Sequence, residues 1–561
     1  MNVQYAKEVI ELPAGSGGKA ETLLMRLIRA GHYVDAPCGG KGTCGRCRVR
    51  FVSEAPQPTA NERRLLTEEE RSSGVRLACE VRVAEACSLQ LPVSREQEID
   101  VLVTADAADG AIPSRTVDEG IPGQTAGTIH GQRDCVAMHS REDAAKIWGH
   151  SGKKRCGAAV DIGTTTLAAT LYDLTDRKRI AAASSVNHQR AYGADVLSRI
   201  QAANEGAAEK LRLSISRDID ALLAGLVADA GIPDDAVEEL VIVGNTTMCH
   251  LLRGLSCAGL GAAPFTPEDL SLWEGSGAEL ALSDQWSVSV TILPGISAFV
   301  GADIVAGIYA LEMDREKNVL LLDIGTNGEM VLGNRERMIA CATAAGPALE
   351  GARIRFGMRG EPGAIDHAAL VGNTLSLSVI GGGEAVGICG SGLIDIAAVL
   401  LDAGMVNARG RLAEPGATLP LGDRIFEAEG QRCFRLTDSV YLTQDDIRQL
   451  QMAKGAIASG IELMAAQLGG GVETIDRVML AGAFGSFIRP ESACRIGLLP
   501  PQLLGRIQAI GNAAGSGARR VACSRAELQR AQTIADRAEF LELAALPEFQ
   551  RTFAQSMRFC P

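Results

Sequence analysis

A chain of 561 residues, at roughly 150 residues per domain, has room for about three or four domains, which excludes a single small fold. Hydrophobic residues make up 46% of the chain and charged residues 22%, so the chain can bury sizeable cores and is not disordered. The 55 basic and 68 acidic residues give a net charge of -13, which disfavours binding to nucleic acid or to acidic membranes. We expect protein and small-molecule partners, with no nucleic acid and no membrane.

The sequence favours a cytoplasmic enzyme. No apolar stretch reaches the roughly 18 residues that span a bilayer, and Lys7, Glu8 and Glu11 stand where a signal peptide needs an apolar core. The 15 cysteines are an odd number spread over a long chain. Such usage argues against a secreted disulfide framework and favours free thiols or metal ligands.

The N-terminal region mixes strand and helix patterns. Alternating apolar residues predict strands within 3–12 and 47–52, and ETLLMRLIRAG at 21–31 predicts a helix. Two Thr–Glu pairs have the spacing of capping boxes at the start of short helices: Thr59 with Glu62, and Thr67 with Glu70. These elements indicate an α+β unit within residues 1–93.

Four cysteines of this unit form a candidate metal site. Three lie in the loop CGGKGTCGRC with spacing C-x5-C-x2-C, and a fourth lies in RLACEVRV; they are Cys38, Cys44, Cys47 and Cys79. Thiolates suit iron-sulfur clusters or zinc, and the loop glycines let the backbone fold tightly around an inorganic core. The pattern resembles the β-grasp fold of plant-type 2Fe-2S ferredoxins, although the loop is one residue longer. A 2Fe-2S cluster is favoured over zinc, because zinc knuckles usually pair two short C-x2-C arms. Cys87 is predicted to be a buried strand residue.

Periodicity fades over residues 94–155, which are rich in Gly, Pro, Thr and Asp. This composition predicts a linker or a reduced middle region. His130, His139, His150 and Cys135 lie here and suggest a second metal site. We favour the simpler interpretation that they are polar residues of a connecting segment.

Two copies of one motif follow this segment. GAAVDIGTTTLAATLYDL is an apolar strand ending on Asp161, a Gly-Thr turn and a second strand, which predicts a hairpin, and NVLLLDIGTNGEMVLGN repeats the pattern around Asp323. Glycine lets the backbone approach a phosphate, while turn N–H groups and hydroxyls donate to its oxygens. A carboxylate at the end of each strand suits hydrated Mg²⁺. The expected phosphate-binding residues are Gly163, Thr164, Thr165, Thr166, Gly325, Thr326 and Asn327.

A third element, RVMLAGAFGSFI at 477–488, is an apolar strand followed by a turn with Gly482 and Gly485. Together the three elements resemble the phosphate-1, phosphate-2 and adenosine motifs of the actin-like (ASKHA) superfamily. The resemblance implies that Gly482 and Gly485 allow the nucleoside to approach. The resemblance implies an α/β domain over 156–561, in which two ribonuclease-H-like halves close on ATP. For two strand-to-helix crossings, VIVGNTTMCH and GICGSGLID, packing and ligand contact are equally good explanations.

The order of 2Fe-2S module, linker and actin-like domain resembles the ATP-dependent reductive activators of corrinoid proteins. Four further runs carry the same resemblance: NHQRAYGADVLSRI, DIGTNGEM, AAGPALEGARI and LTQDDIRQLQMAKGAI. The resemblance implies transfer of one electron from the 2Fe-2S cluster to Co(II) of a corrinoid protein, which regenerates Co(I) for methyl transfer. It also implies ATP and Mg²⁺ as cofactors, and two partners: a corrinoid protein of a methyltransferase system and an upstream low-potential electron donor.

The chemistry of the residues fits this role. A single 2Fe-2S centre moves one electron, plant-type clusters lie near about -400 mV, and every ~59 mV of mismatch costs a factor of ten in equilibrium. ATP can close such a gap by favouring one of two protein states. We assign Asp161 and Asp323 to magnesium and the attacking water. Lys454 is interpreted as a solvated charge rather than a nucleotide contact, and Glu329 as a strand-face residue rather than a catalytic base.

Three alternatives stay open at this point. In the first alternative, the chain is an ATP-driven electron donor to another low-potential enzyme. Such activators usually hold a 4Fe-4S cluster between two subunits, but bridging cysteines are not evident here, and Cys341 and Cys389 are expected to be buried. Alternatively, it is an actin-like small-molecule kinase or chaperone-like ATPase with a ferredoxin sensor. An ordinary ferredoxin reductase lacks support, since no G-x-G-x-x-G follows a predicted strand. The sequence does not fix the oligomeric state, and a homodimer is compatible with it.

Overall fold

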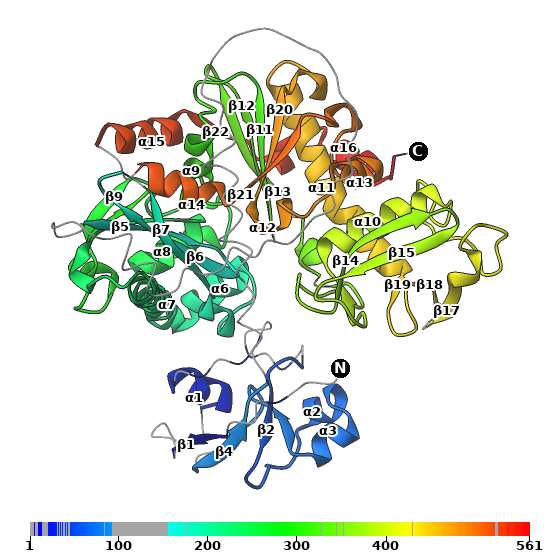
Figure 1. Cartoon of the computed structure of the whole chain (residues 1–561), viewed down its shortest axis with the longest axis horizontal. Helices are drawn as coiled ribbons and strands as arrows, with labels where there is room; N and C mark the ends of the chain where they lie inside the picture. Colours follow the sequence, from blue (N-terminus) through cyan, green and yellow to red (C-terminus); the bar gives the residue numbers. More distant parts are fainter. Residues whose placement is uncertain are drawn as a thin grey trace.

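The computed structural model covers an N-terminal unit and a large C-terminal body (Figure 1). The described residues are 5, 9–13, 21–30, 32, 34, 36, 40, 42, 45–82, 85–92, 155–176, 178–325, 327–343, 345–351, 353–428, 430–521 and 525–560. The segment predicted as a linker, with His130, Cys135, His139 and His150, lies outside them. No helix within these residues is long and apolar enough to cross a bilayer.

The N-terminal unit is a four-stranded sheet in the order β1-β4-β2-β3. Its strands are β1 Ile10–Leu12, β2 Arg48–Phe51, β3 Val75–Leu77 and β4 Cys87–Gln90, and its helices are α1 Leu23–Arg29, α2 Ala60–Leu65 and α3 Glu68–Ser72. Leu23, Leu24 and Leu27 of α1 are buried in one core with the sheet residues, as the helical spacing of these leucines predicts. Both predicted capping boxes are present, at Thr59 and Thr67. The sequence therefore predicted the helices and two of the strands of this unit, whereas β3 was not predicted and β1 is shorter than the predicted strand.

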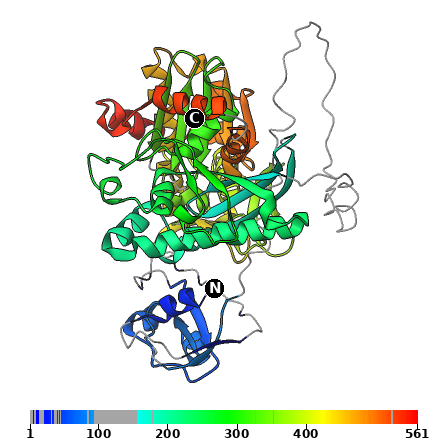
Figure 2. The same ribbon diagram turned by 90° about the vertical axis from the view of Figure 1, so that its left-hand side faces the viewer.

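The first large sheet has the order β7-β6-β5-β8-β10-β9. Its strands are β5 Cys156–Ile162, β6 Thr166–Asp173, β7 Arg179–Val186, β8 Val237–Gly244, β9 Trp273–Ser276 and β10 Ser289–Ile292. β5, β6 and β7 form an antiparallel meander, which confirms the predicted hairpin, and β8 and β10 continue the sheet in parallel. The helices of this unit are α6 Val196–Ala202, α7 Ala208–Ala230 and α8 Thr246–Arg253. The long helix α7 runs along one side of the body (Figure 2).

The second large sheet repeats this plan in the order β21-β20-β11-β12-β13-β22. Its strands are β11 Val319–Ile324, β12 Gly328–Gly333, β13 Met338–Thr343, β20 Arg477–Ala481, β21 Ile507–Gly511 and β22 Ala538–Phe540. Again a three-stranded antiparallel meander is extended by two parallel strands, β20 and β21. The repeat predicted from the sequence is thus a duplicated fold. Its other helices are α11 Gln444–Gln467, α12 Gly482–Gly485, α13 Pro490–Ile496, α15 Arg525–Arg537 and α16 Phe549–Ser556.

Two helices join the duplicated halves, α9 Ala302–Ala310 and α14 Ala513–Val521. They pack closely, because a Cβ added at Gly517 would collide with the carbonyl oxygen of Ala306. One hydrophobic core includes residues of both sheets and of both helices. This shared core holds the ends of β5 and β11 in a fixed relation.

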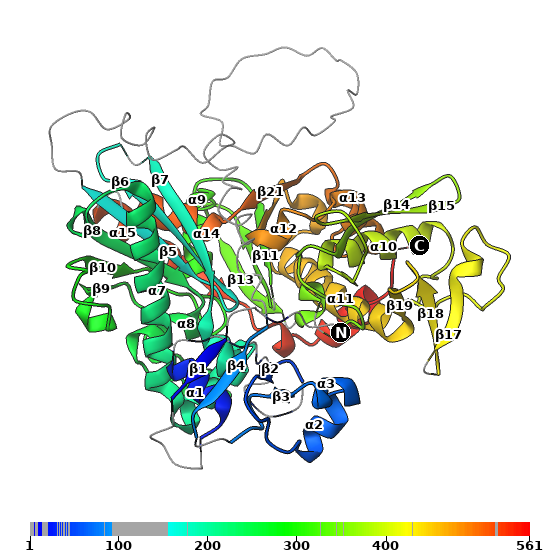
Figure 3. The same cartoon turned by 60° about the horizontal axis from the view of Figure 1, so that its bottom comes forward.

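A smaller unit is inserted between β13 and α11 and lies on the opposite side of the body from the first sheet (Figures 1 and 3). It contains two three-stranded sheets and one buried helix, α10 Gly390–Asp402. The strands are β14 Ala364–Val371, β15 Thr374–Val379, β16 Gly387–Ile388, β17 Ile425–Ala428, β18 Gln431–Arg435 and β19 Tyr441–Thr443. The strand-to-helix crossing predicted at GICGSGLID is the step from β16 to α10.

Candidate functional site

The two repeated aspartates lie near the carboxyl ends of matching strands. Asp161 in β5 is opposite Ala168 in β6, and Asp323 in β11 is opposite Glu329 in β12. Although they come from different sheets, the two carboxylates are close enough for the charge of Asp323 to raise the pKa of Asp161. The structure therefore brings the predicted pair together.

Two further carboxylates join them, Asp303 of α9 and Glu329 of β12. Burial raises the pKa of Asp161 to about 8, and the charges of Asp303 and Asp323 add to the shift. Burial raises the pKa of Asp323 to about 6. The pKa of Glu329 rises well above its usual range through burial and then through the charges of the three aspartates. Burial and mutual repulsion thus favour the protonated forms of these four carboxyl groups, and Mg²⁺ is usually held by one or two carboxylates together with water and phosphate.

The sequence interpretation of Glu329 was incomplete. Glu329 does lie on a strand face, but that face is directed at the aspartates of both halves. Asp303 was not singled out at all. Its side chain accepts a hydrogen bond from the N–H of Ile304 at 2.8 Å, in the first turn of α9. Asn512, just before α14, donates a side-chain hydrogen bond to Asp161.

The first predicted phosphate-binding loop, residues 163–166, accepts hydrogen bonds from three side chains. Nδ2 of Asn187 donates to the carbonyl of Gly163 at 2.9 Å, and Nδ2 of Asn245 donates to the hydroxyl of Thr164 at 3.0 Å. The guanidinium of Arg199 donates to the carbonyl of Thr164. These residues come from the runs NHQRAYGADVLSRI and VIVGNTTMCH, so both runs position this loop. Contact of Thr165 and Thr166 with a phosphate stays a prediction.

The second loop makes a similar but shorter turn. The N–H of Gly325 donates to the carbonyl of Asn327, two residues on, at 2.9 Å, whereas the N–H of Gly163 donates to that of Thr166, three residues on, at 3.0 Å. No atom lies closer than 3.9 Å to a Cβ built on Gly325, so this backbone has room for a ligand on that side among the described residues. Thr326 lies outside the described residues.

The third element follows β20. Gly482 has φ +78°, and a Cβ added there would lie 2.7 Å from Oδ1 of Asp323. Gly485 ends the short helix α12, with a Cβ position 3.2 Å from the backbone of Leu480. Glycine at 482 is therefore required by the close approach of Asp323, while the predicted nucleoside contacts of Gly482 and Gly485 stay predictions.

Gly482→Ala tests this close approach. The left-handed backbone costs a side chain about 1–2 kcal/mol, and the collision with Asp323 displaces that carboxylate in addition. We expect nucleotide affinity to fall about tenfold or more, since ~1.4 kcal/mol is a factor of ten. Gly505→Ala is the matched control, because Gly505 has φ +91° with no atom within 4 Å of its Cβ position. Equal nucleotide affinities of the two variants, measured by calorimetry, would contradict the assignment.

The cysteine site is described in part. Cys47 and Cys79 are buried, and their Sγ atoms lie 3.3 Å apart without a disulfide. Two thiolates on one tetrahedral metal lie within about 4 Å of each other, so the pair fits a shared iron. Gly40, Gly42 and Gly45 have φ of +78°, +68° and +66°, as a tight loop around a cluster requires. Cys38 and Cys44 lie outside the described residues, and their role as ligands stays a prediction.

Other cysteines are separate from this pair. Cys87 is buried in β4, and Cys341 and Cys389 are buried in the C-terminal body, as predicted. Within the described part of the chain, no group of three or more His, Cys, Asp and Glu side chains is arranged to hold a metal ion.

Lys454 is not a solvated charge, and this interpretation was wrong. The side chain is 1% exposed, and its Nζ donates to the carbonyls of Gly497 at 3.2 Å and Arg558 at 2.6 Å. Burial lowers its pKa to about 8, although the charge of Cys560 opposes the shift. Lys454 thus fastens the C-terminal segment to α11. The helical pattern did not reveal this, because the partners are backbone atoms of distant residues.

Because Lys454 is buried, we expect the folding stability of the protein to depend on pH. Below its folded pKa of about 8, Lys454 is charged in both states and burial of the charge destabilises the folded state. Between about 8 and 10.5, only the unfolded state keeps the proton, so stability rises with pH. The melting temperature of the wild type minus that of Lys454→Met should therefore increase from about pH 7.5 to about pH 9.5. A difference that stays constant with pH would contradict this placement.

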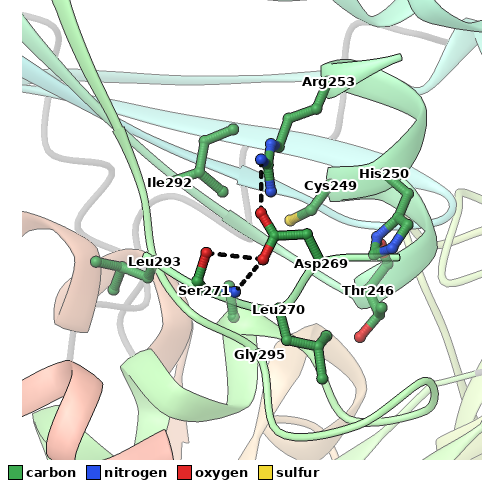
Figure 4. A pocket seen from close by; sticks show the side chains of 11 residues that line it. Thr246, Cys249, His250, Arg253, Asp269, Leu270, Ser271, Ile292, Leu293 and Gly295 are labelled. Atoms are coloured by element: carbon green, nitrogen blue, oxygen red, sulfur yellow. Dashed lines mark hydrogen bonds and ion pairs between the residues drawn. The ribbon is translucent and has the colours of Figure 1, made fainter. Parts of the chain in front are cut away.

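A small hollow opens beside α8 in the first-sheet unit (Figure 4). Arg253 and Asp269 form an ion pair across it at 2.7 Å. Burial alone would raise the pKa of Asp269, but hydrogen bonds from Ser271 and Arg253 lower it to about 2. Both ring nitrogens of His250 form hydrogen bonds: Nδ1 with the carbonyl of Thr246, and Nε2 as the acceptor from the N–H of Glu268. We interpret the hollow as structural support for the loop that follows α8.

The duplicated sheets, the paired acidic loops and the preceding cysteine unit define an ASKHA ATPase fold joined to a ferredoxin domain. Sequence models of three known regions match the chain. They are the 2Fe-2S iron-sulfur cluster binding domain over residues 16–84, the RACo middle region over 156–316, and the C-terminal domain of RACo, the ASKHA domain, over 317–561. The chain belongs to the RACo family, whose function is the reductive activation of corrinoid proteins.

Individual relatives agree with this family. The corrinoid activation enzyme RamQ of Eubacterium limosum is 34% identical over 418 residues, which cover 72% of this chain and 70% of RamQ. A [Co(II) methylated amine-specific corrinoid protein] reductase of Methanosarcina barkeri is 26% identical over 382 residues, or 61% of this chain and 66% of the relative. The solved structure of a reductive activator for a corrinoid, iron-sulfur protein has 29% identity and a TM-score of 0.65, and the match covers 97% of this chain and 96% of that one.

The predicted class and function are thus confirmed: a 2Fe-2S ferredoxin domain, an ASKHA domain and corrinoid reductive activation. The middle-region match ends at residue 316, inside the segment 156–561 that the sequence predicts as one actin-like domain. The predicted domain bounds, including a reduced middle region within 94–155, stay predictions.

Proposed function

We propose that this chain restores the Co(I) state of a corrinoid protein in a methyltransferase system by donating one electron to its Co(II) form in an ATP-dependent reaction. The observation that carries the proposal is the joining, in one chain, of a 2Fe-2S domain to two sheet halves that bring four carboxylates together. The similarity to a corrinoid activation enzyme and to a corrinoid protein reductase supports the same function. A low-potential donor upstream supplies the electron, and a cytoplasmic location belongs to the same proposal.

The two halves supply different residues to the ATP site. Asp161 and Asp323 hold Mg²⁺ and orient the attacking water, and Asp303 and Glu329 add negative charge around them. Mg²⁺, when bound, would neutralise charge at this site. The loop at 163–166, positioned by Asn187, receives phosphate oxygens on its N–H groups and hydroxyls. Because the carboxylates come from both halves, nucleotide favours the state in which the halves are close.

This arrangement couples ATP to a difficult reduction. A ligand shifts a two-state equilibrium by its differential affinity for the states, and every ~59 mV of unfavourable potential requires a tenfold shift for one electron. Nucleotide held by carboxylates of both halves has such a differential affinity, since opening the halves separates Asp161 from Asp323. The partner is recognised in one state, and the product complex dissociates from the other.

An ATPase assay tests the proposal against a small-molecule kinase. Phosphate release is measured with Mg²⁺ alone, with a Co(II) corrinoid protein, and with a panel of sugars and short carboxylic acids. We expect slow hydrolysis that rises when the corrinoid protein is added. Transfer of phosphate to a small molecule, with no response to the corrinoid protein, would favour the kinase.

A further inference from the structure

A carboxylate lies directly under the cysteine loop of the N-terminal unit. Glu80 follows Cys79 in the chain, and a Cβ added at Gly42, between Cys38 and Cys44, would collide with Oε1 of Glu80. Glu80 thus contacts the loop at Gly42 and is adjacent to Cys79, whose Sγ lies 3.3 Å from that of Cys47. The acidic side chain of Glu80 is therefore close both to the cysteine loop and to Cys79.

Both oxygens of this carboxylate are fixed. The hydroxyl of Thr59 donates to Oε2 at 3.1 Å, and Nδ2 of Asn61 donates to Oε1 at 3.1 Å. Thr59 is itself the N-cap of α2, and its capping box is closed by Glu62. Because the two donors belong to one short, capped helix, Glu80 is held against the loop rather than extended into solvent.

Arg48 and Arg76, on the strands beside the cysteines, have carboxylate or carbonyl partners of their own. Arg48 donates to the carbonyl of Gly45 in the cysteine loop and forms an ion pair with Glu70 at 3.0 Å, and Arg76 donates to the carbonyls of Pro56, Arg71 and Val75. A second carboxylate, Glu62, is fully buried and accepts from the N–H of Leu77 at 2.7 Å. Glu80 is thus the carboxylate that contacts the loop, while the charge of Glu62 is offset by that of the neighbouring Arg76.

We infer that Glu80 lowers the reduction potential of the 2Fe-2S cluster, which makes the reduced cluster a stronger one-electron donor. Reduction adds one electron to a cluster that already carries thiolate charge, and a neighbouring carboxylate disfavours the added charge. Net charge near a cluster is one of the factors that set its potential. The inference rests on the proposed cluster ligands Cys38, Cys44, Cys47 and Cys79.

The test is a redox titration of the full-length, anaerobically reconstituted protein, followed by the electron paramagnetic resonance signal of the reduced cluster. Glu80→Gln keeps the size and hydrogen-bonding atoms of the side chain but removes its charge. We expect this variant to be reduced more easily, with a threefold to tenfold larger reduced-to-oxidised ratio at a given potential, where tenfold is ~59 mV. Glu69→Gln, at an exposed position of α3, removes the same charge away from the loop and should match the wild type.

A second variant keeps the test decisive if Glu80→Gln loses its cluster. Asn61→Lys places an ammonium group beside Oε1 of Glu80, where it offsets the negative charge, and should also make the cluster easier to reduce. An unchanged or lower potential in either variant would overturn the inference. Iron and sulfide content is measured in parallel, so failure of the proposed ligand set is distinguished from failure of the role of Glu80.

Discussion

Asp161→Asn should abolish ATP turnover and leave the visible absorption of the iron-sulfur cluster unchanged. The amide keeps the size of the side chain but lacks the negative charge that attracts Mg²⁺, and loss of a group that stabilises developing charge costs about a hundredfold or more in rate. The fold should survive, because Asp161 is repelled by Asp303 and Asp323 and the substitution relieves that repulsion. Phosphate release in the presence of the corrinoid protein measures the effect.

The control for this variant is Asp173→Asn. Asp173 lies in the same hairpin, opposite Cys156 at the other end of β5, and caps a turn through the N–H of Thr175 at 2.6 Å. It should keep nearly full ATP turnover. Full activity of Asp161→Asn would contradict the assignment of the acidic site.

Cys79→Ala should remove the cluster while nucleotide binding persists. Cys79 supplies one of two thiols that lie 3.3 Å apart, and a cluster left with three of its four thiolates loses the closed ligand set that retains it. We expect iron and sulfide content to fall severalfold and Co(II) reduction to disappear. Metal analysis and visible absorption measure the first effect.

Cys87→Ala serves as the matched control, because Cys87 is a buried cysteine of the same sheet. It should cost some stability through the lost packing but keep its iron. A fully loaded Cys79→Ala variant would show that the fourth ligand lies elsewhere.

Local patterns predicted the elements that carry the chemistry. The repeated strand-turn-strand motif around Asp161 and Asp323 forms an antiparallel hairpin in both copies, because the apolar strand and the glycine turn are both encoded within about twenty residues. The capping box at Thr59 is local in the same way. The residues that interact in such a turn or cap are only a few positions apart in the sequence. These features could therefore be predicted without knowledge of the fold.

Contacts between residues that are distant in the sequence and come together only in the tertiary fold were not predicted. Asp303 and Asn512 belong to α9 and to the turn before α14, and they reach Asp161 because these helices cross at the junction of the halves. Glu329 shares a register position with Asp323, and that pairing shows its direction. Lys454 has backbone carbonyls of the C-terminal segment as partners, which no side-chain pattern records.

The most direct test combines the purified, reconstituted chain with a Co(II) corrinoid protein and a low-potential reductant, and follows the Co(I) absorption band before and after ATP is added. The account predicts little Co(I) without ATP, a clear rise with ATP, and no rise when Asp161→Asn replaces the wild type. A Co(I) band of the same size with and without ATP would contradict the coupling of the two domains.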